Sequence, residues 1–261
     1  MRALITGASS GIGRDMARYL SKLGYDLVIV ARNKEQLEKL KNELKTNVEI
    51  IAMDLSDKDN CYKLHEQIKD IDLLINNAGF GEFGEFIETN LEKEIALINT
   101  NITALHILTK LYLKDMVTIN KGHILNVASI AGFMPGPLMA TYYASKNYVV
   151  SLTRAIKKEL KKMKSNVKIS LLCPGPVNTN FNRVANVNFK VKGITSEYVA
   201  KYAIDNTLKN KFIIIPGISI KLTKIFAKIM PTEILEEFCY HIQERKKKIK
   251  ITLCKFAKIR A

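Results

Sequence analysis

The chain has few cysteines and no long uncharged apolar run. Its 261 residues include four cysteines, Cys61, Cys173, Cys239 and Cys254, and no two of them form a Cys-x-x-Cys pair. This scatter argues against a disulfide framework or a zinc site, and it is typical of a reducing compartment. The apolar runs are far shorter than the roughly 18 residues that cross a bilayer. We therefore expect a cytoplasmic protein with neither disulfides nor a transmembrane helix.

Metal-ligand patterns and a secretion signal are missing as well. The four histidines, His65, His106, His123 and His241, show no metal-ligand spacing, so we expect no bound metal. The first five residues, Met-Arg-Ala-Leu-Ile, lead directly into a strand pattern. They leave no room for the charged, apolar and cleavage regions of a signal peptide, so secretion is not expected.

Acidic residues are scarce relative to basic ones. The chain has 25 Asp and Glu against 41 Lys and Arg, a formal net charge of +16. Residues 201–261 hold 14 of the basic and 5 of the acidic residues, so 14 − 5 = +9 of the excess lies in the last quarter of the chain. Such a block favours an anionic partner. Because no zinc-finger spacing, RNA-recognition motif or heptad repeat accompanies it, we expect no nucleic acid partner.

Seven short apolar runs rich in β-branched residues alternate with helical patterns. The chain is 47% hydrophobic over 261 residues, which is enough for one well-filled domain. The helical stretches carry apolar residues at spacings such as Leu37, Leu40 and Leu44. Strands that are apolar throughout, separated by single helices, indicate a parallel sheet covered on both faces. The sequence predicts an α/β fold with a single doubly wound, seven-stranded Rossmann sheet, its strands near residues 3–6, 26–30, 48–53, 71–76, 122–127, 167–173 and 211–215.

A glycine-rich turn follows the first expected strand. Residues 6–13 read Thr-Gly-Ala-Ser-Ser-Gly-Ile-Gly, and a helical pattern runs on from there to Leu23. Glycines let the backbone approach a pyrophosphate closely, and the N–H groups at the start of the helix then face the anion. A tight strand-to-helix turn without a ligand would use the same residues. Companion motifs are therefore needed to decide between the two.

Three further motifs stand after other expected strands. They are Asn-Asn-Ala-Gly at 76–79, Ser129 with the pair Tyr142 and Lys146, and Pro-Gly-Pro-Val-Asn-Thr at 174–179. Together with the glycine-rich turn, they resemble the motifs of the short-chain dehydrogenase/reductases (SDR) in their short form. The resemblance covers residues 1 to about 215. It implies an oxidoreductase that uses a nicotinamide dinucleotide.

The resemblance assigns a catalytic set of four residues. Tyr142 and Lys146 are four positions apart and share one face of a helix, whereas Tyr143 stands three positions from the lysine and fits the family's Tyr-x-x-x-Lys less well. Ser129 precedes Tyr142 by 142 − 129 = 13 residues, the usual separation in the family. Asn101 matches the fourth member. We therefore expect Asn101, Ser129, Tyr142 and Lys146 to be the catalytic residues.

Carbonyl reduction needs an acid that gives a proton to the developing alkoxide. A free tyrosine has a pKa of about 10, but a lysine ammonium about 4 Å away would favour tyrosinate by roughly 4 kcal/mol at an effective dielectric of about 20. We expect Lys146 to lower the pKa of Tyr142 in this way. The resemblance adds that Lys146 holds the nicotinamide ribose, that Ser129 binds the substrate oxygen, and that Asn101 anchors a water in a proton relay.

The end of the second expected strand bears on the choice of cofactor. An acidic residue there would bind the ribose 2′-hydroxyl of NAD, but the sequence has Ala31 followed by Arg32. A guanidinium can pair with the 2′-phosphate of NADP through charge-assisted hydrogen bonds, so we expect NADP. The resemblance gives the expected cofactor-binding residues as Gly7, Ser9, Ser10, Gly11, Ile12, Gly13, Arg32, Asp54, Leu55, Asn77, Ala78, Gly79, Tyr142, Lys146, Pro174, Gly175, Val177 and Thr179.

Apolar segments are expected around the substrate. They contain Phe80, Phe133, Met134, Leu138 and Phe181, and apolar walls favour a hydrophobic carbonyl over a phosphorylated sugar. Together with the expected cofactor, they predict an NADPH-dependent carbonyl reductase that acts on a hydrophobic ketone or 3-oxoacyl substrate. An NAD(H)-linked alcohol dehydrogenase is one alternative, which the end of the second strand disfavours. A non-catalytic dinucleotide-sensing protein is another, which the intact catalytic set disfavours.

The chain continues beyond the last expected strand. Residues 1–215 should form the dinucleotide-binding and catalytic domain, and residues 216–261 a basic amphipathic helical extension of it. Such an extension packs on the domain or on a partner subunit, or it lies on an anionic membrane as a peripheral contact. Because many tetrameric relatives end near this point, we expect a homodimer rather than a tetramer. One apolar stripe at helical spacing, with lysines on the other face, consists of Leu222, Ile225, Phe226 and Ile229.

Overall fold

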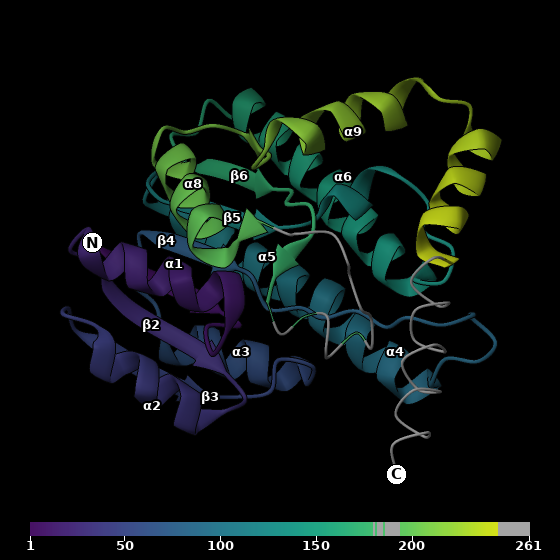
Figure 1. Ribbon diagram of the computed structural model, residues 1–261. Coiled ribbons are helices and arrows are strands. Elements are labelled where there is room, and N and C mark those ends of the chain that lie inside the picture. The colour runs from purple at the N-terminus through teal and green to yellow at the C-terminus, as the bar shows by residue number, and fades with distance from the viewer. Residues whose placement is uncertain (180, 182–184, 186–193, 245–261) are drawn as a thin grey trace, which may run out of the picture.

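The structure is a computed structural model that describes residues 1–179, 181, 185 and 194–244. Within these residues, seven parallel strands form one sheet in the order β3-β2-β1-β4-β5-β6-β9 (Figure 1). This confirms the predicted doubly wound Rossmann sheet, and each strand matches a predicted run, with β1 beginning and β2 ending one residue outside it. Their bounds are β1 Arg2–Thr6, β2 Asp26–Ala31, β3 Val48–Ala52, β4 Leu73–Asn76, β5 His123–Val127, β6 Lys168–Leu172 and β9 Ile213–Ile214.

Strand β1 lies at the point where the order of the sheet reverses. It pairs with β2 on one side, with Ile5 opposite Ile29, and with β4 on the other, with Ile5 opposite Ile75. In doubly wound sheets the connections leave a crevice at the carboxyl ends of the strands at such a point. The glycine-rich turn follows β1 directly, so the fold carries it to that crevice.

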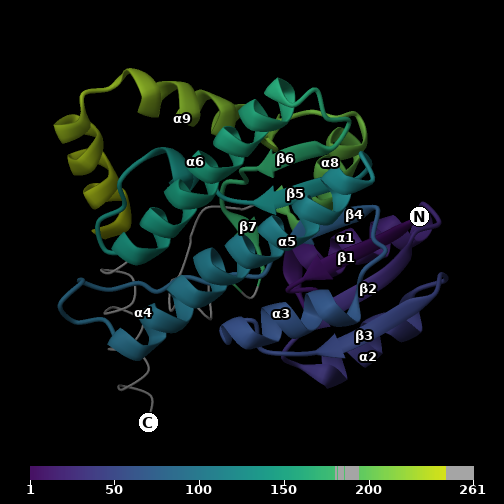
Figure 2. The ribbon, with the colours of Figure 1, turned by 180° about the vertical axis from the view of Figure 1, so that it is seen from behind.

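Helices cover both faces of the sheet (Figure 2). Alternate residues of β1 enter two different cores, because successive strand side chains point to opposite faces: Ile5 packs in one core and Leu4 in the other. The helices of the first face are α1 Gly11–Lys22, α2 Lys34–Glu43 and α8 Ser196–Leu208. Those of the second are α3 Lys58–Gln67, α5 Leu105–Thr118 and α6 Ala140–Lys162, with α4 Leu91–Ile98 joined to α5 through a π-helical segment, Asn99–Ala104.

Beyond the sheet, β7 (Val177–Asn178) and β8 (Ile194–Thr195) pair as a separate two-stranded parallel unit. Helix α9 (Ile218–Ile229) follows β9, and residues 232–244 form a further helix. The rest of the predicted extension, residues 245–261, lies outside the described residues. None of the described helices is both long and apolar enough to cross a bilayer. The three cysteines in the described part, Cys61, Cys173 and Cys239, are buried.

Helix α9 does not bury its apolar stripe. Its buried residue is Ala227. On the same side of the helix, Ile220 packs against the core that contains residues of β6 and α6. The predicted apolar stripe points away from the domain instead, because its residues Leu222, Ile225, Phe226 and Ile229 are all exposed. The sequence period grouped the right residues on one face, but that face does not cover this chain's own core.

Candidate active site

Three elements bring the predicted catalytic residues to the carboxyl edge of the sheet. Ser129 follows β5 and caps the 3₁₀ turn Ile130–Phe133, where its Oγ accepts a hydrogen bond of 3.2 Å from the amide of Ala131. The same hydroxyl donates to the carbonyl of Pro174 at 3.5 Å, beyond β6. Tyr142 and Lys146 lie one turn apart on α6. Asn101 lies in the π-helical segment between α4 and α5.

Lys146 is buried against the end of β5. Its Nζ donates a hydrogen bond of 3.1 Å to the carbonyl of Val127 and lies 5.8 Å from the centroid of the Tyr142 ring. Burial disfavours the ammonium form and lowers the pKa of Lys146 to about 8. The group is therefore held close to the tyrosine with a pKa near neutrality.

The pKa of Tyr142 differs from the expected lowering. Burial raises it to about 12, and hydrogen bonding with Ser129 acts in the opposite direction. Desolvation of the buried phenol is the larger of the two effects, and the nearby Lys146 ammonium donates to the Val127 carbonyl. Tyr142 therefore stays a neutral O–H donor at neutral pH.

Asn101 is held on three sides by protein groups. Its Oδ1 accepts from the amide of Phe80 at 3.0 Å, and its Nδ2 donates to the carbonyl of Phe80 at 2.9 Å and to Ser145 Oγ at 3.0 Å. Ser145 in turn donates to the main-chain carbonyl of Tyr142 at 2.7 Å. Ser145 thus connects Asn101 with the helix that bears the tyrosine. The spacing arguments missed this residue, although it immediately precedes Lys146 and is completely buried.

Two glycines after β4 make room for these groups. A Cβ on Gly79 would lie 2.8 Å from Asn101 Oδ1 and 3.4 Å from Lys146 Nζ. A Cβ on Gly81 would lie 2.8 Å from the Phe181 ring and 3.3 Å from the Tyr142 ring. Gly79 was predicted from its motif. Gly81 was not, because nothing in the sequence shows that two aromatic rings approach it.

The glycine-rich turn has the backbone that a bound diphosphate requires. Gly7 and Gly11 have φ of +67° and +56°, values that other residues rarely adopt. A Cβ on Gly13 would collide with Asn77 Nδ2 and with the carbonyl of Gly7. The first turn of α1 has no acidic residue, and its N-cap, Ser10, makes no side-chain capping bond. Its N–H groups are therefore left for an anion.

Asn77 and Ala78 support this turn from β4. The side-chain Nδ2 of Asn77 donates to the carbonyls of Thr6 at 3.0 Å and Gly7 at 3.2 Å. Thr6 Oγ1 accepts from the amides of Asn77 and Ala78, both at 3.0 Å. Across the turn, a Cβ on Gly11 would touch Thr179 at 3.1 Å. The first and last of the predicted cofactor motifs are therefore adjacent in space.

Three predicted cofactor-binding residues lie at or beyond the ends of β2 and β3: two are at the surface and one is in the core. Arg32 Nη1 lies 3.9 Å from Asp54 Oδ2, and both side chains are exposed at the ends of β2 and β3. Leu55, by contrast, is buried in the core of the second face. Its side chain is therefore a packing group, while Arg32 and Asp54 remain accessible to a ligand.

The expected substrate wall is separated into two clusters. Leu138 and Phe181 pack with Tyr142, whose ring centroid lies 5.3 Å from that of Phe181. Phe133 instead lies between Arg154 and Lys224, and Met134 packs with the C-terminal helices. These two residues differ from the prediction because the 3₁₀ turn after Ser129 directs them toward α9. Phe80 is half-buried and is held by Asn101 through its backbone.

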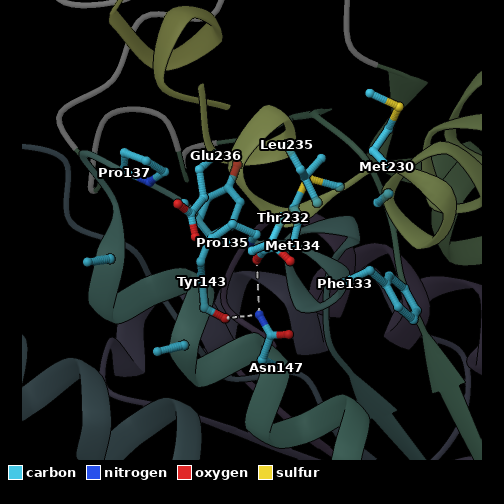
Figure 3. Close-up of a pocket in the computed structure, with 14 residues that line it drawn as sticks. Phe133, Met134, Pro135, Pro137, Tyr143, Asn147, Met230, Thr232, Leu235 and Glu236 are labelled. Carbon is cyan, nitrogen blue, oxygen red and sulfur yellow. Dashed lines mark hydrogen bonds between the residues drawn. The ribbon is translucent and has the colours of Figure 1, made fainter. Parts of the chain in front are cut away.

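Phe133 and Met134 line a cavity of about 700 Å³ between the first turns of α6 and the C-terminal helices. Figure 3 shows Tyr143 and Asn147 of α6 on one side of it and Met230 and Leu235 on the other. Of the two adjacent tyrosines, Tyr143 faces this cavity, and its hydroxyl accepts a hydrogen bond of 2.7 Å from Gln243. The cavity therefore adjoins the helix of the catalytic set but lies on the Tyr143 side.

Comparison with known proteins agrees with this geometry. The family model of the short chain dehydrogenases matches residues 1–188. The chain is 34% identical over 182 residues to an uncharacterized oxidoreductase of Staphylococcus epidermidis, covering 68% of this chain and 78% of that protein. It is 34% identical to the 3-oxoacyl-acyl-carrier-protein reductase of Rickettsia bellii over 70% of this chain and 76% of that one. Estradiol 17-beta-dehydrogenase 11 of Rattus norvegicus is 31% identical, over 89% and 80%.

Solved structures show the same fold. A short-chain dehydrogenase from Sphingobium yanoikuyae in complex with NADPH has a TM-score of 0.78 and 27% identity, covering 87% of this chain and 92% of that one. One from Burkholderia phymatum in complex with NAD also has a TM-score of 0.78, with 26% identity over 86% and 91%. The chain belongs to the short-chain dehydrogenase/reductase family, and it is an oxidoreductase of that family with a dinucleotide-binding fold.

Proposed function

We propose that this oxidoreductase uses NADPH to reduce a hydrophobic ketone or a 3-oxoacyl-type carbonyl. The observation that carries the proposal is the convergence of Ser129, Tyr142 and Lys146 beside Gly79, at the edge where the glycine-rich turn ends. A proton donor, a hydrogen-bond donor and a cation thus adjoin the cofactor crevice, which is the arrangement that carbonyl reduction requires.

The turn fits a nicotinamide dinucleotide through Gly7, Gly11 and the uncapped start of α1. When bound, that group supplies the hydride. In the proposed reaction the Tyr142 hydroxyl donates a hydrogen bond to the substrate carbonyl oxygen and then transfers its proton to it, so the phenolic O–H bond breaks and the product hydroxyl forms. Ser129 Oγ stabilises the same oxygen while negative charge develops on it.

Lys146, Asn101 and Ser145 support this step in different ways. The buried ammonium of Lys146 stabilises the tyrosinate left after proton transfer, and it is placed to hold the ribose. Asn101 and Ser145 are positioning residues that fix the Gly79 segment and the first turn of α6. The amide hydrogens of Asn101 are both engaged by protein acceptors, so any water it holds would have to use the free lone pair of Oδ1 or a backbone group.

Selection of NADPH rests on Arg32. The side chain stands at the end of β2, the position of the ribose 2′ group in dinucleotide folds, and Asp54 beside it is exposed. An exposed ion pair at 3.9 Å is worth little, so the guanidinium is available to a phosphate. The solved relatives bind NADPH in one case and NAD in another, and the family fold therefore leaves this choice to side chains such as Arg32.

A hydrophobic substrate is supported by the groups around Tyr142. Leu138, Phe181 and Gly81 surround its ring. Two of the relatives are named for a 3-oxoacyl thioester and for a steroid. An aromatic and aliphatic wall suits either carbonyl.

We further propose a homodimer of a cytoplasmic protein, with residues 1–215 as the catalytic domain and 216–261 as its extension. Exposed apolar side chains on and before α4, namely Phe86, Ile87, Leu91 and Ile95, support self-association. The buried thiols of the described part suit a reducing compartment. Light scattering of the purified protein tests the dimer.

The reaction is tested by titrating the protein with NADPH and NADH and then following nicotinamide absorbance with a panel of carbonyls. Medium-chain 3-oxoacyl thioesters, steroid ketones and sugar phosphates form suitable arms. We expect turnover of an apolar carbonyl with NADPH. Binding of both cofactors without turnover of any carbonyl, in the reductive or the reverse direction, would support a dinucleotide sensor instead.

A further inference from the structure

Helix α9 presents an apolar ridge to solvent. Ile218, Leu222, Ile225 and Ile229 are between 54% and 76% exposed, and at 3.6 residues per turn they share an arc of roughly 60°. In a surface helix of a globular protein such a stripe normally faces the core. Here the core is contacted by the opposite side, through Ile220 and Ala227. The exposed ridge is therefore not explained by packing within the described chain.

The next helix continues this surface. In residues 232–244, Ile234, Phe238 and Ile242 are exposed and recur every four residues, and the ring of Phe238 lies 5.5 Å from that of Phe226 on α9. The contact joins the two helices into one surface. We call it the C-terminal apolar face, and it comprises Ile218, Leu222, Ile225, Phe226, Ile229, Ile234, Phe238 and Ile242.

Buried contacts fix the outward orientation of this face. Leu235, Cys239 and Ala227 form a small core with Met134, and Gln243 is 1% exposed with its amide bonded to Tyr143. Rolling the helices to bury the ridge would expose that core and break the bond. The apolar face is thus held outward by the same contacts that attach the helices to α6 (Figure 3).

The charges around the face identify its partner. Lys221 and Lys228 are exposed along one side of the ridge, and residues 245–261 contain eight Lys and Arg and no acidic residue. Residues 218–261 hold 11 basic and 4 acidic residues, 11 − 4 = +7. A second copy would carry the same net positive charge, which disfavours its approach. A bilayer with anionic headgroups instead accepts apolar side chains and lysines together.

We infer that the C-terminal apolar face docks on the surface of an anionic membrane, in the plane of its headgroups. The inference goes beyond the proposed reaction and does not depend on it. The apolar ridge would insert at the level of the acyl boundary, and Lys221 and Lys228 would lie among the headgroup phosphates. The cavity between these helices and α6 would then be next to the bilayer.

Co-sedimentation of the full-length protein with lipid vesicles tests the inference. Vesicles of phosphatidylcholine with phosphatidylglycerol are compared with pure phosphatidylcholine, at low and high salt. We expect binding to the anionic vesicles at low salt, and binding at least about tenfold weaker to neutral vesicles or at high salt, because screening shortens the reach of the lysines. Lys221→Gln combined with Lys228→Gln should weaken anionic binding by about tenfold.

The apolar contribution is tested by the double variant Ile225→Glu, Ile229→Glu. Both side chains are exposed, so folding should be preserved, as circular dichroism and an unchanged melting temperature would show. The matched control is Ile119→Glu, at the end of α5, where the side chain is 67% exposed. We expect the double variant to lose anionic vesicle binding by at least about tenfold and the control to retain it.

Three outcomes would overturn the inference. One is a wild-type protein that does not bind anionic vesicles at low salt, and another is a folded double variant that binds as well as the control. The third is a wild-type protein that does not bind vesicles together with a double variant whose mass by light scattering is smaller than that of wild type. That result would assign the face to a second copy of the chain. Carbonyl turnover in solution is measured in parallel, so that failure of the proposed reaction is recognised separately.

Discussion

The rings of Tyr142 and Tyr143 meet edge to face, with centroids 6.0 Å apart and planes at 78°, yet their hydroxyls belong to different parts of the molecule. Tyr142 packs with Phe181 and faces Ser129. Tyr143 bonds to Gln243 in the C-terminal helix. Adjacent residues on one helix point about 100° apart, so one ring faces the proposed active site and the other contributes to attachment of the C-terminal helix.

Tyr142→Phe should abolish carbonyl reduction while NADPH binding is retained, because the ring remains and the proton donor is lost. Tyr143→Phe is the matched control. It removes the bond to Gln243 and should lower the free energy of unfolding by about 1 kcal/mol while keeping most of the activity. Turnover, cofactor fluorescence titration and urea unfolding of both variants check this. An inactive Tyr143→Phe beside an active Tyr142→Phe would reverse the assignment.

The pH profile should reflect Lys146. Its buried ammonium has a pKa lowered to about 8, so the folded enzyme loses this proton well below the range of a free lysine. Above about pH 8 the charge that supports Tyr142 and the ribose is lost, and kcat/KM should fall. Lys146→Met should be slower at every pH and show no descending limb near pH 8. A wild-type profile that stays level through pH 9.5 would contradict this assignment.

Arg32→Ala should raise KM for NADPH by about tenfold or more, equivalent to about 1.4 kcal/mol, because the guanidinium no longer meets the 2′-phosphate. KM for NADH should change little. Steady-state kinetics with both cofactors measure the difference. An equal rise in KM for NADPH and NADH would show that Arg32 contributes to cofactor binding without recognising the 2′-phosphate.

Gly79→Ala should reduce activity by at least about tenfold, because its Cβ would press on Asn101 Oδ1 at 2.8 Å and approach Lys146 Nζ at 3.4 Å. Gly24→Ala is a useful control. Gly24 has a positive φ of +84° and open space around its Cβ position, so the substitution introduces backbone strain without crowding. It should cost about 1 kcal/mol of stability and leave kcat unchanged. Comparable losses of kcat in both variants would show that crowding of Asn101 and Lys146 is not the cause.

Stability should fall in mild acid because of His123. Its Nε2 lies 2.9 Å from Ser170 Oγ, and that hydroxyl donates to the carbonyl of Lys211 at 2.8 Å. Ser170 thus accepts from a neutral imidazole, and burial lowers the pKa of His123 to about 4. Since the unfolded chain binds the proton near pH 6.5, stability present above that pH is lost progressively toward pH 4, by about 3 kcal/mol. Urea unfolding of wild type and His123→Gln from pH 7.5 to 4.5 should show a smaller loss in the variant.

The sheet could be predicted because local rules determine it, and the same rules give the placement of the proposed catalytic residues. The β-branched runs at β1 and β2 have only one way to be buried, and a helix of fixed pitch necessarily puts Tyr142 and Lys146 on one face. The positive φ at Gly7 and Gly11 likewise follows from a turn that must bring backbone to a phosphate.

Other features depend on tertiary packing that no local pattern encodes. The direction of Phe133 is set by Arg154 and Lys224 on either side of it, and those residues are distant in sequence. The helical period of α9 grouped Leu222 with Ile229 but could not say whether that face turns inward. The π-helical segment that carries Asn101 and the link through Ser145 have no sequence signature of this kind.

The bond between Gln243 and Tyr143 spans 100 residues of sequence, and this has a consequence for biosynthesis. The polypeptide that emerges first contains the whole sheet and the helix bearing Tyr142 and Tyr143, but Gln243, which clamps the first turn of that helix, is translated 100 residues after Tyr143. A nascent chain paused before residue 243 would therefore have a complete sheet with this helix not yet attached to the C-terminal helix.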